Sequence, residues 1–324
     1  MPFRQTSVSG LPAIALRNAE LEVVAVPSVG MKLTNLRRTR GREWLWRSDQ
    51  IRLEQPRQAT SFVETADTGG WDECFPTVGA SPIPGAPQES PALPDHGELW
   101  SASWTSSTYE HAGGVTLAAS AAGSLLPYEF HREVTLDPRE PVMRLRYRVK
   151  NTGESPFPWI WSSHPIFNVQ PGTTLELPSV RQVKLDAVHG LPELSRGDIV
   201  SWPDAFGGEG GRFTFPERGT WAAKLFGDVG AAGRMILTDP RRNERLEMVV
   251  RPEEVPQVGI WINNRGWAPP GRRPYYNLAL EPAIGAPDRL DEAVRDWGTA
   301  QTLDPGQERS WGLEVWVLED NASG

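Results

Sequence analysis

Alternation between hydrophobic and polar residues recurs from one end of this chain to the other. The clearest run is VMRLRYRVKN at residues 142–151, in which apolar side chains alternate with Arg and Lys. Successive side chains of a strand point to opposite faces, so this run predicts a half-buried antiparallel strand. Similar patterns, some of them less regular, predict strands at residues 20–26, 115–121, 128–136, 245–250 and 310–318.

Only one segment has a helical period. Within residues 287–297, Leu290, Val294 and Trp297 fall at i, i+4 and i+7, and Asp288 is placed to cap the first turn. Residues 79–94 are rich in Pro and Gly and predict an irregular loop. Because no repeat, Gly/Ser linker or change of composition divides the chain, the patterns predict an all-β protein with one large sandwich-type domain over residues 1–324.

Composition narrows the classes of function. The chain has 33 basic and 41 acidic residues, with the two signs interspersed and no basic block, which argues against a nucleic-acid partner. A single cysteine excludes an intramolecular disulfide and a zinc site made of several thiolates. The N-terminus has no signal-peptide pattern, and no apolar run reaches the roughly 20 residues that span a bilayer. We therefore expect a soluble, cytoplasmic protein with no membrane partner.

Two histidines stand in unusual local settings. His96 lies between the Pro- and Gly-rich loop and a strand-like segment, where a rigid scaffold can present a functional group. The alternative is a loop histidine that only caps a turn with Asp95. His164 directly precedes Pro165, which holds the residue before it in an extended conformation.

Glu281 has the same arrangement before Pro282. Alternation places Glu281 on the strand face opposite Leu278 and Leu280, which suits a carboxylate in a cleft. Taken alone, each of these dipeptides is equally compatible with an ordinary surface position. The other histidines are expected in surface or loop positions: His111, His131 and His189.

The order of these segments resembles that of a known superfamily. The stretches are GGWDECFPTVG at 69–79, PDHGELW at 94–100, HPIFN at 164–168 and LEPAIG at 280–285, which together span about two thirds of the chain. In this order they resemble the aldose 1-epimerase and hexose-6-phosphate mutarotase superfamily, the galactose mutarotase-like proteins. The resemblance implies a large antiparallel β-supersandwich, a shallow sugar cleft, and His96, His164 and Glu281 at the positions of the family's functional residues.

The chain departs from the phosphosugar branch of that superfamily. The branch usually carries an arginine before its Gly-Gly and another after the aromatic residue that follows His-Gly, whereas this chain has Thr68 and reads HGELW. The resemblance therefore leaves the partner open between a monosaccharide and a sugar phosphate.

Interconversion of the α and β anomers of an aldose needs one base and one acid. The base removes the C1 hydroxyl proton while the acid protonates the ring oxygen, and the open aldehyde rotates and closes on its other face. The resemblance assigns Glu281 as base and His164 as acid, with His96 hydrogen-bonded near the ring oxygen; which histidine donates the proton stays open. We expect no cofactor and no metal. A two-histidine, one-carboxylate metal site is an alternative that close-spaced ligands do not support.

Five further residues are expected to bind the sugar. Trp71, Asp72 and Glu73 lie in the GGWDECFP stretch, where carboxylates and an indole suit hydroxyl recognition and stacking; the alternative is a solvated acidic strand edge. Trp261 is a second candidate platform, and Arg265 could clamp a phosphate or a carboxylate. Arg272 and Arg273 lie nearby, and all three arginines could equally belong to a solvated loop.

Two other classes of function remain open at this point. A carbohydrate-binding protein could keep the cleft without turnover. A glycoside-processing enzyme of the same architecture would need a second carboxylate across from Glu281, for which Asp72 and Glu73 are the candidates. A lyase is disfavoured because the chain lacks a helical domain.

Overall fold

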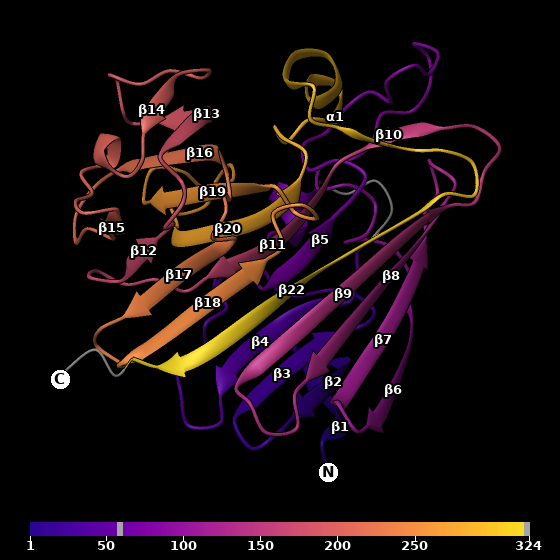
Figure 1. The fold of residues 1–324 in the computed structure, drawn as a ribbon, viewed down its shortest axis with the longest axis horizontal. Coiled ribbons are helices and arrows are strands. Elements are labelled where there is room, and N and C mark those ends of the chain that lie inside the picture. The colour runs from indigo at the N-terminus through magenta and orange to yellow at the C-terminus, as the bar shows by residue number, and fades with distance from the viewer. Residues whose placement is uncertain (57–60, 321–324) are drawn as a thin grey trace.

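The computed structural model describes residues 1–56 and 61–320, and it consists of two large antiparallel sheets (Figure 1). The first has eleven strands in the spatial order β1 (Phe3–Val8), β2 (Leu11–Arg17), β3 (Leu21–Val26), β4 (Lys32–Arg38), β5 (Trp71–Cys74), β11 (Trp161–Phe167), β20 (Tyr276–Ile284), β19 (Gln257–Asn264), β16 (Trp221–Asp228), β13 (Gln182–His189) and β14 (Ile199–Ser201). The second has nine, in the order β15 (Arg212–Thr214), β12 (Thr174–Glu176), β17 (Arg234–Asp239), β18 (Glu244–Val250), β22 (Glu308–Glu319), β9 (Val142–Asn151), β8 (Tyr128–Leu136), β7 (Gly114–Ala122) and β6 (Thr105–His111).

Short elements complete the described chain. Strands β10 (Phe157–Trp159) and β21 (Gln301–Leu303) form a small ribbon. The helical turns are η1 (Phe62–Ala66), η2 (Asp204–Phe206), α1 (Leu290–Glu292) and η3 (Ala293–Trp297). In the described residues no helix has the length and apolar character needed to cross a membrane.

All six strands that the sequence patterns predicted are present, and the all-β fold is confirmed. The predicted strand at 142–151 coincides with β9, and the other five predicted strands correspond to β3, β7, β8, β18 and β22. The loop at 79–94 forms only isolated bridges. The predicted helix is present but begins at Leu290, and Asp288 does not cap it because the Asp288 carboxylate lies 3.2 Å from the Lys224 ammonium instead.

The two sheets pack face to face around an aromatic core. Trp161 of β11 lies 5.1 Å from Trp311 of β22, measured between ring centroids. A buried carboxylate sits in the same layer: Glu73 of β5 accepts hydrogen bonds from Arg132 (3.0 Å), Tyr147 (2.9 Å) and Trp161 (3.0 Å). Three donors satisfy this carboxylate, as the burial of a charge requires. At β5 and β11 the inner face of the eleven-stranded sheet is therefore filled by core side chains.

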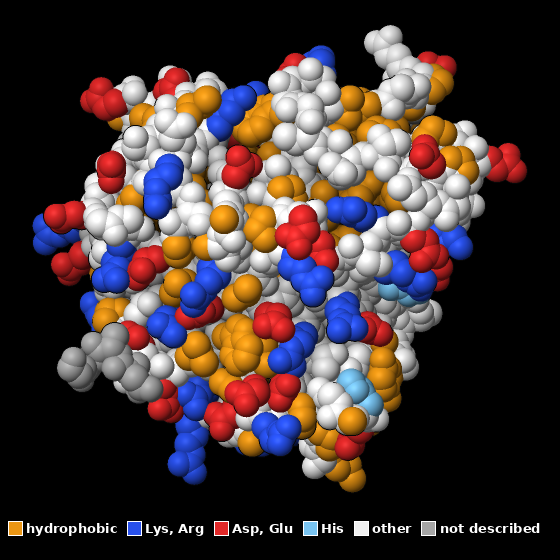
Figure 2. Space-filling view, viewed as in Figure 1, with side chains coloured by type: hydrophobic (Ala, Val, Ile, Leu, Met, Phe, Trp, Pro, Cys, Tyr) orange, Lys and Arg blue, Asp and Glu red, His pale blue; other side chains and the backbone are white. Residues whose placement is uncertain are grey.

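The opposite side of the molecule is the outer face of the nine-stranded sheet. Its strands run diagonally across the view in Figure 1, with α1 at the upper edge. On this face Lys and Arg side chains are intermingled with Asp and Glu, and no extended patch of one sign is visible (Figure 2).

Candidate functional site

The two histidines and the glutamate singled out in the sequence lie together on the outer face of the eleven-stranded sheet. Strands β11 and β20 pair with Ser162 opposite Ala283 and Ile166 opposite Ala279, so His164 and Glu281 fall midway between these pairs on neighbouring strands. His164 Nε2 lies 3.9 Å from Glu281 Oε1. The ring of His96 lies 4.8 Å from the ring of His164, edge to face. All three line one cavity of about 270 Å³.

Aromatic side chains form one wall of this cavity. Trp261, Trp267 and Tyr275 line it, with Trp261 and Trp267 packed edge to face at 5.7 Å. His189, at the end of β13, also lines the cavity and meets the edge of Trp261 at 6.2 Å. His189 is exposed, as expected, but it is also part of the cavity wall, because antiparallel pairing with β16 brings the end of β13 to the cavity.

Glu281 is fully buried, and its two carboxylate oxygens have different environments. Oε2 accepts hydrogen bonds from the Lys224 ammonium (2.6 Å) and from the Ser162 hydroxyl (3.3 Å). Oε1 has no hydrogen-bond partner among the described residues and points to His164. A buried acceptor without a partner is costly, so Oε1 is the atom best prepared to receive a proton from a ligand.

Lys224 joins Glu281 to a second carboxylate, that of Asp288, at 3.2 Å. Burial lowers the pKa of Lys224, but Asp288 and Glu281 more than offset this and raise the pKa above its usual value. Burial also raises the pKa of Asp288 to about 6, against the opposing influence of Lys224. The ammonium therefore stays charged between the two carboxylates.

His96 occupies a strained position. Its backbone φ is 62°, in the left-handed region that residues with a side chain rarely adopt, and such strain collects at functional sites. Phe62 stacks on its ring at 3.7 Å, and Asp95 Oδ2 lies 3.1 Å from Nδ1. Burial lowers the pKa of His96, but Asp95 outweighs burial and the net change is upward. The charged imidazolium is thereby favoured.

His164 has the opposite electrostatic setting. Burial lowers its pKa well below the usual value, and the positive charges of His96, Lys224 and Lys32 lower it further. Its Nδ1 has no hydrogen-bond partner among the described residues. The two histidines thus form an asymmetric pair, in which the proton rests on His96 and His164 is neutral.

Acidic groups dominate the rest of the site. Asp67 lines the cavity, and burial raises its pKa to about 6, against the opposing influence of His96. Asp72 of β5 pairs with His164 of β11 and faces the same side of the sheet. The Asp72 carboxylate accepts a hydrogen bond from Lys32 at 2.7 Å. Lys32 and Asp72 are both buried beside the cavity, and their opposite charges compensate each other.

The predicted sugar-binding residues separate into two groups. Trp261 lines the cavity, whereas Trp71 and Glu73 do not, because they project from the face of β5 opposite to Asp72 and pack into the core between the sheets. The alternative of a solvated strand edge is also wrong, since the whole WDEC segment is buried. Glu73 therefore cannot supply a second carboxylate for glycoside hydrolysis.

The predicted arginine clamp does not line the cavity. The Arg265 guanidinium lies 4.0 Å from the ring centroid of Tyr276 and donates to Asn264. Arg272 donates to the backbone oxygen of Gln50 and Arg273 pairs with Asp49 at the surface. The structure therefore supports the alternative, in which these three arginines belong to a loop and do not bind the ligand.

Sequence reasoning missed several residues of the site. Lys224, Asp288, Asp67 and Phe62 line the cavity but belong to no motif that was recognised. Lys224 carried the one available signal, because it is the only charged residue in the otherwise apolar run WAAKLF of β16. A lone charge in a buried run indicates a buried partner, although the run does not say which one.

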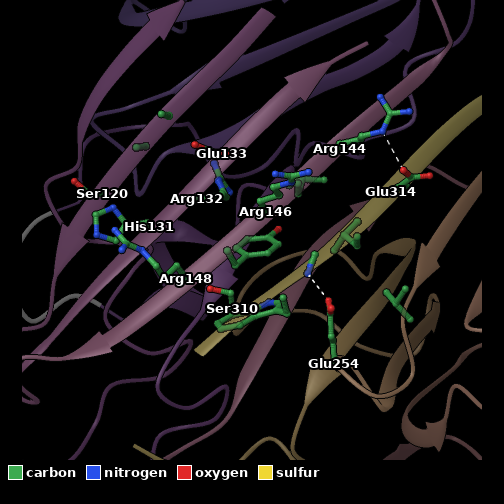
Figure 3. A pocket seen from close by; sticks show the side chains of 18 of the residues that line it. Ser120, His131, Arg132, Glu133, Arg144, Arg146, Arg148, Glu254, Ser310 and Glu314 are labelled. Carbon is green, nitrogen blue, oxygen red and sulfur yellow. Dashed lines mark hydrogen bonds and ion pairs between the residues drawn. The ribbon is translucent and has the colours of Figure 1, made fainter. Parts of the chain in front are cut away.

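A larger hollow of about 980 Å³ lies on the outer face of the nine-stranded sheet (Figure 3). Its charges are largely used within the sheet: Arg144 pairs with Glu314, and the backbone N–H of Gly312 donates to Glu254. Among the described residues, the carboxylates that line this hollow have no buried oxygen without a partner, whereas Glu281 Oε1 in the smaller cavity is such an atom. The smaller cavity is therefore the candidate functional site.

The chain matches one protein family and resembles several solved structures. A model of the aldose 1-epimerase family matches residues 12–316. No protein of curated function matches the chain. Among solved structures, the Slr1438 protein from Synechocystis sp. PCC 6803 is similar with a TM-score of 0.69 and 18% identity, over 95% of this chain and 96% of that one.

Two further solved structures share the fold. A galactose mutarotase-like protein from Clostridium acetobutylicum has a TM-score of 0.70 and 12% identity, over 98% of both chains. A galactose mutarotase-like protein from Lactobacillus casei has a TM-score of 0.64 and 16% identity, over 94% of this chain and 100% of that one. At these identities the likeness concerns the fold.

Proposed function

Because this chain belongs to the aldose 1-epimerase family, we propose that it is a cofactor-independent mutarotase that interconverts the α and β anomers of an unphosphorylated aldose. The observation that carries this proposal is the unpaired Oε1 of Glu281, which faces two histidines across one cavity. A buried carboxylate opposite imidazoles is the pair of groups that ring opening and reclosure need.

In the proposed reaction Glu281 Oε1 removes the C1 hydroxyl proton while an imidazole protonates the ring oxygen. The C1–O5 bond breaks, the aldehyde rotates about C1–C2, and reclosure returns both protons. The sequence-based assignment makes His164 the acid. The contact of His96 with Asp95 favours His96 as the donor, with neutral His164 hydrogen-bonded to the reacting oxygens.

The size and charge of the cavity support a single neutral sugar as the partner. Its volume of about 270 Å³ is slightly below the roughly 300–1,000 Å³ of pockets for drug-sized ligands, which suits one ring rather than a chain. Four carboxylates line it, those of Asp67, Asp95, Glu281 and Asp288, against Lys224 and the His96 imidazolium, both of which already have carboxylate partners. A phosphate or uronate would meet like charges, which costs affinity. The indoles of Trp261 and Trp267 offer faces for the C–H side of a pyranose.

The experiment that tests the proposal is anomer exchange measured by NMR on α-glucose, α-galactose and glucose 6-phosphate. Wild type should accelerate exchange of a neutral aldose, and Glu281→Gln should lose about 10²–10⁴ of that acceleration. Glu217→Gln, a change at an exposed glutamate, is the matched control and should behave as wild type. Acceleration of glucose 6-phosphate equal to that of glucose would contradict the neutral substrate class.

Two other outcomes would redirect the interpretation. Sugars that quench tryptophan fluorescence without any acceleration would make the protein a carbohydrate-binding protein. Release of reducing sugar from an oligosaccharide would make it a glycoside-processing enzyme.

A further inference from the structure

Cys74, the only cysteine of the chain, lies beside the two histidines of the cavity. It is fully buried at the end of β5, and it pairs with Ser162 on β11, so it shares a sheet face with Asp72, Ser162 and His164. One ligand atom from each of Cys74, His96 and His164 lies within 4.8 Å of the other two. The sulfur therefore forms part of the floor beneath the histidines.

We propose that this floor is a binding site for a thiophilic divalent cation, of which Zn²⁺ is the type, held by Cys74 Sγ and one ring nitrogen each of His96 and His164. A thiolate with two imidazoles is a donor set that zinc prefers. In a tetrahedral site with Zn–S of about 2.3 Å and Zn–N of about 2.0–2.1 Å, these donors lie roughly 3.5 Å apart. The three ligand atoms now lie within 4.8 Å of one another, so each must move by about 1 Å to bind one cation.

Two further features of the cavity point to the same ligand. Asp95 Oδ2 lies 3.1 Å from His96 Nδ1, which leaves Nε2 for a metal and reproduces the carboxylate–histidine pair that orients metal-bound imidazoles. His164 Nδ1 and Glu281 Oε1 are buried and have no hydrogen-bond partner in the described chain. Glu281 Oε1, 3.9 Å from His164 Nε2, is placed to be the fourth ligand, unless a water takes that position.

Binding forms a metal–sulfur bond and releases the thiol proton to the buffer. Burial raises the pKa of the Cys74 thiol well above its usual value, and Glu281 and Asp72 raise it further, so the cation must displace this proton and binding strengthens as pH rises. An occupied site engages both histidines and shuts off anomer exchange. This inhibition, though not the binding itself, rests on the function proposed above.

Cobalt(II) is the probe for the binding, because its spectrum reports its ligands. Titration of Co²⁺ into metal-free wild type should produce a thiolate-to-cobalt charge-transfer band that saturates at one cobalt per chain. Since the chain has one cysteine, this band assigns Cys74 without any substitution. Zn²⁺ should abolish the band by competition. A folded wild type that gives no such band would overturn the proposal.

Three variants sharpen the assignment. Cys74→Ser should lose the band, and Cys74→Ala serves the same purpose if the serine variant fails to fold. Asp95→Asn should keep the band but weaken cobalt affinity about 10- to 100-fold, as expected for a carboxylate that orients a metal-bound histidine. His111→Gln, at an exposed histidine far along β6, is the matched control and should bind as wild type. Unchanged affinity in Asp95→Asn would remove that residue from the site.

The regulatory part is tested separately from the function. The ratio of anomer exchange with and without Zn²⁺ should fall at least about tenfold in wild type and stay near one in the Cys74 variants. A cobalt band in a protein without mutarotase activity would uphold the metal site and overturn the proposed function. If cobalt binds but Zn²⁺ leaves anomer exchange unchanged, the proposed inhibition is overturned and the metal site is upheld.

Discussion

The Lys224 ammonium lies 2.6 Å from Oε2 of Glu281 and leaves Oε1 of the same carboxylate facing His164. This division of one carboxylate has two consequences. The ammonium gives the buried carboxylate an oppositely charged partner, and the hydrogen bond fixes the orientation of the carboxylate so that its unpaired oxygen points into the cavity. We therefore regard Lys224 as a positioning residue for the proposed base.

Replacement of Lys224 tests this relationship. Lys224→Met leaves two carboxylates, the buried Glu281 and the partly buried Asp288, without their shared cation, so we expect the free energy of unfolding to fall by about 3–5 kcal/mol. The double variant Lys224→Met/Glu281→Gln should recover part of this loss, because it removes one of the unpaired charges. A double-mutant cycle in urea measures the coupling between the two residues. Additive losses would show that the pair is not coupled.

Arg132 tests the core between the sheets. Its buried guanidinium donates to Glu73 and to the backbone oxygen of Met31, so Arg132→Met should cost about 3–5 kcal/mol of unfolding free energy. Arg146→Met is the control on the adjacent strand: both arginines appear in Figure 3, but Arg146 is exposed, and its loss should stay within about 0.5 kcal/mol. Equal losses in urea unfolding would contradict the structural role of the Glu73–Arg132 pair.

The local periodicity of the sequence located six of the described strands, but the faces of the site strands were harder to assign. Alternation placed Glu281 on the face opposite Leu278 and Leu280, and Glu281 does line the cavity, together with Asn277 of the same face. For WDEC the same alternation separates Trp71 and Glu73 from Asp72 and Cys74, yet it does not say which pair faces the cleft. That choice depends on the pairing of β5 with β11, a contact between segments about 90 residues apart in sequence.

The ion pairs of the site were not predictable for the same reason. Lys224 and Glu281 are separated by 57 residues and meet only because β16, β19 and β20 are neighbours in the sheet. The dipeptides His164–Pro165 and Glu281–Pro282 pointed to two residues of the site, because proline holds the residue before it in an extended conformation. Which groups would surround these side chains followed from tertiary packing that no short stretch encodes.

Asp137, in the turn after β8, predicts a pH dependence of stability. Partial burial raises its pKa, but the backbone N–H groups of Arg139 and Glu140 and the guanidinium of Arg144 more than offset this and lower the pKa to about 2. A folded-state pKa below the unfolded value of about 3.9 means that the carboxylate stabilises the fold above about pH 4. This contribution is lost as the pH falls toward 2.

Asp137→Asn should therefore lower the unfolding free energy by up to about 1 kcal/mol at pH 7, a modest value because solvent screens this turn. The difference from wild type should vanish as the pH is lowered from 4 to 2, within the window set by the two pKa values. Asp304→Asn, at an exposed turn aspartate, is the control. Urea unfolding across this pH range measures both, and a difference that persists at the acid end would contradict the assignment.

The pH dependence of anomer exchange can decide which histidine donates the proton. An acid must be protonated to act, so the rate should fall as the pH rises through the pKa of the donor. Asp95 raises the pKa of His96 and does not contribute to that of His164. If His96 is the donor, Asp95→Asn should move the alkaline limb of the pH–rate profile to lower pH, and His96→Asn should cost about 10²–10⁴ in rate. The profiles are measured with EDTA present, so that bound metal does not contribute. An alkaline limb that Asp95→Asn leaves in place would return the role of acid to His164.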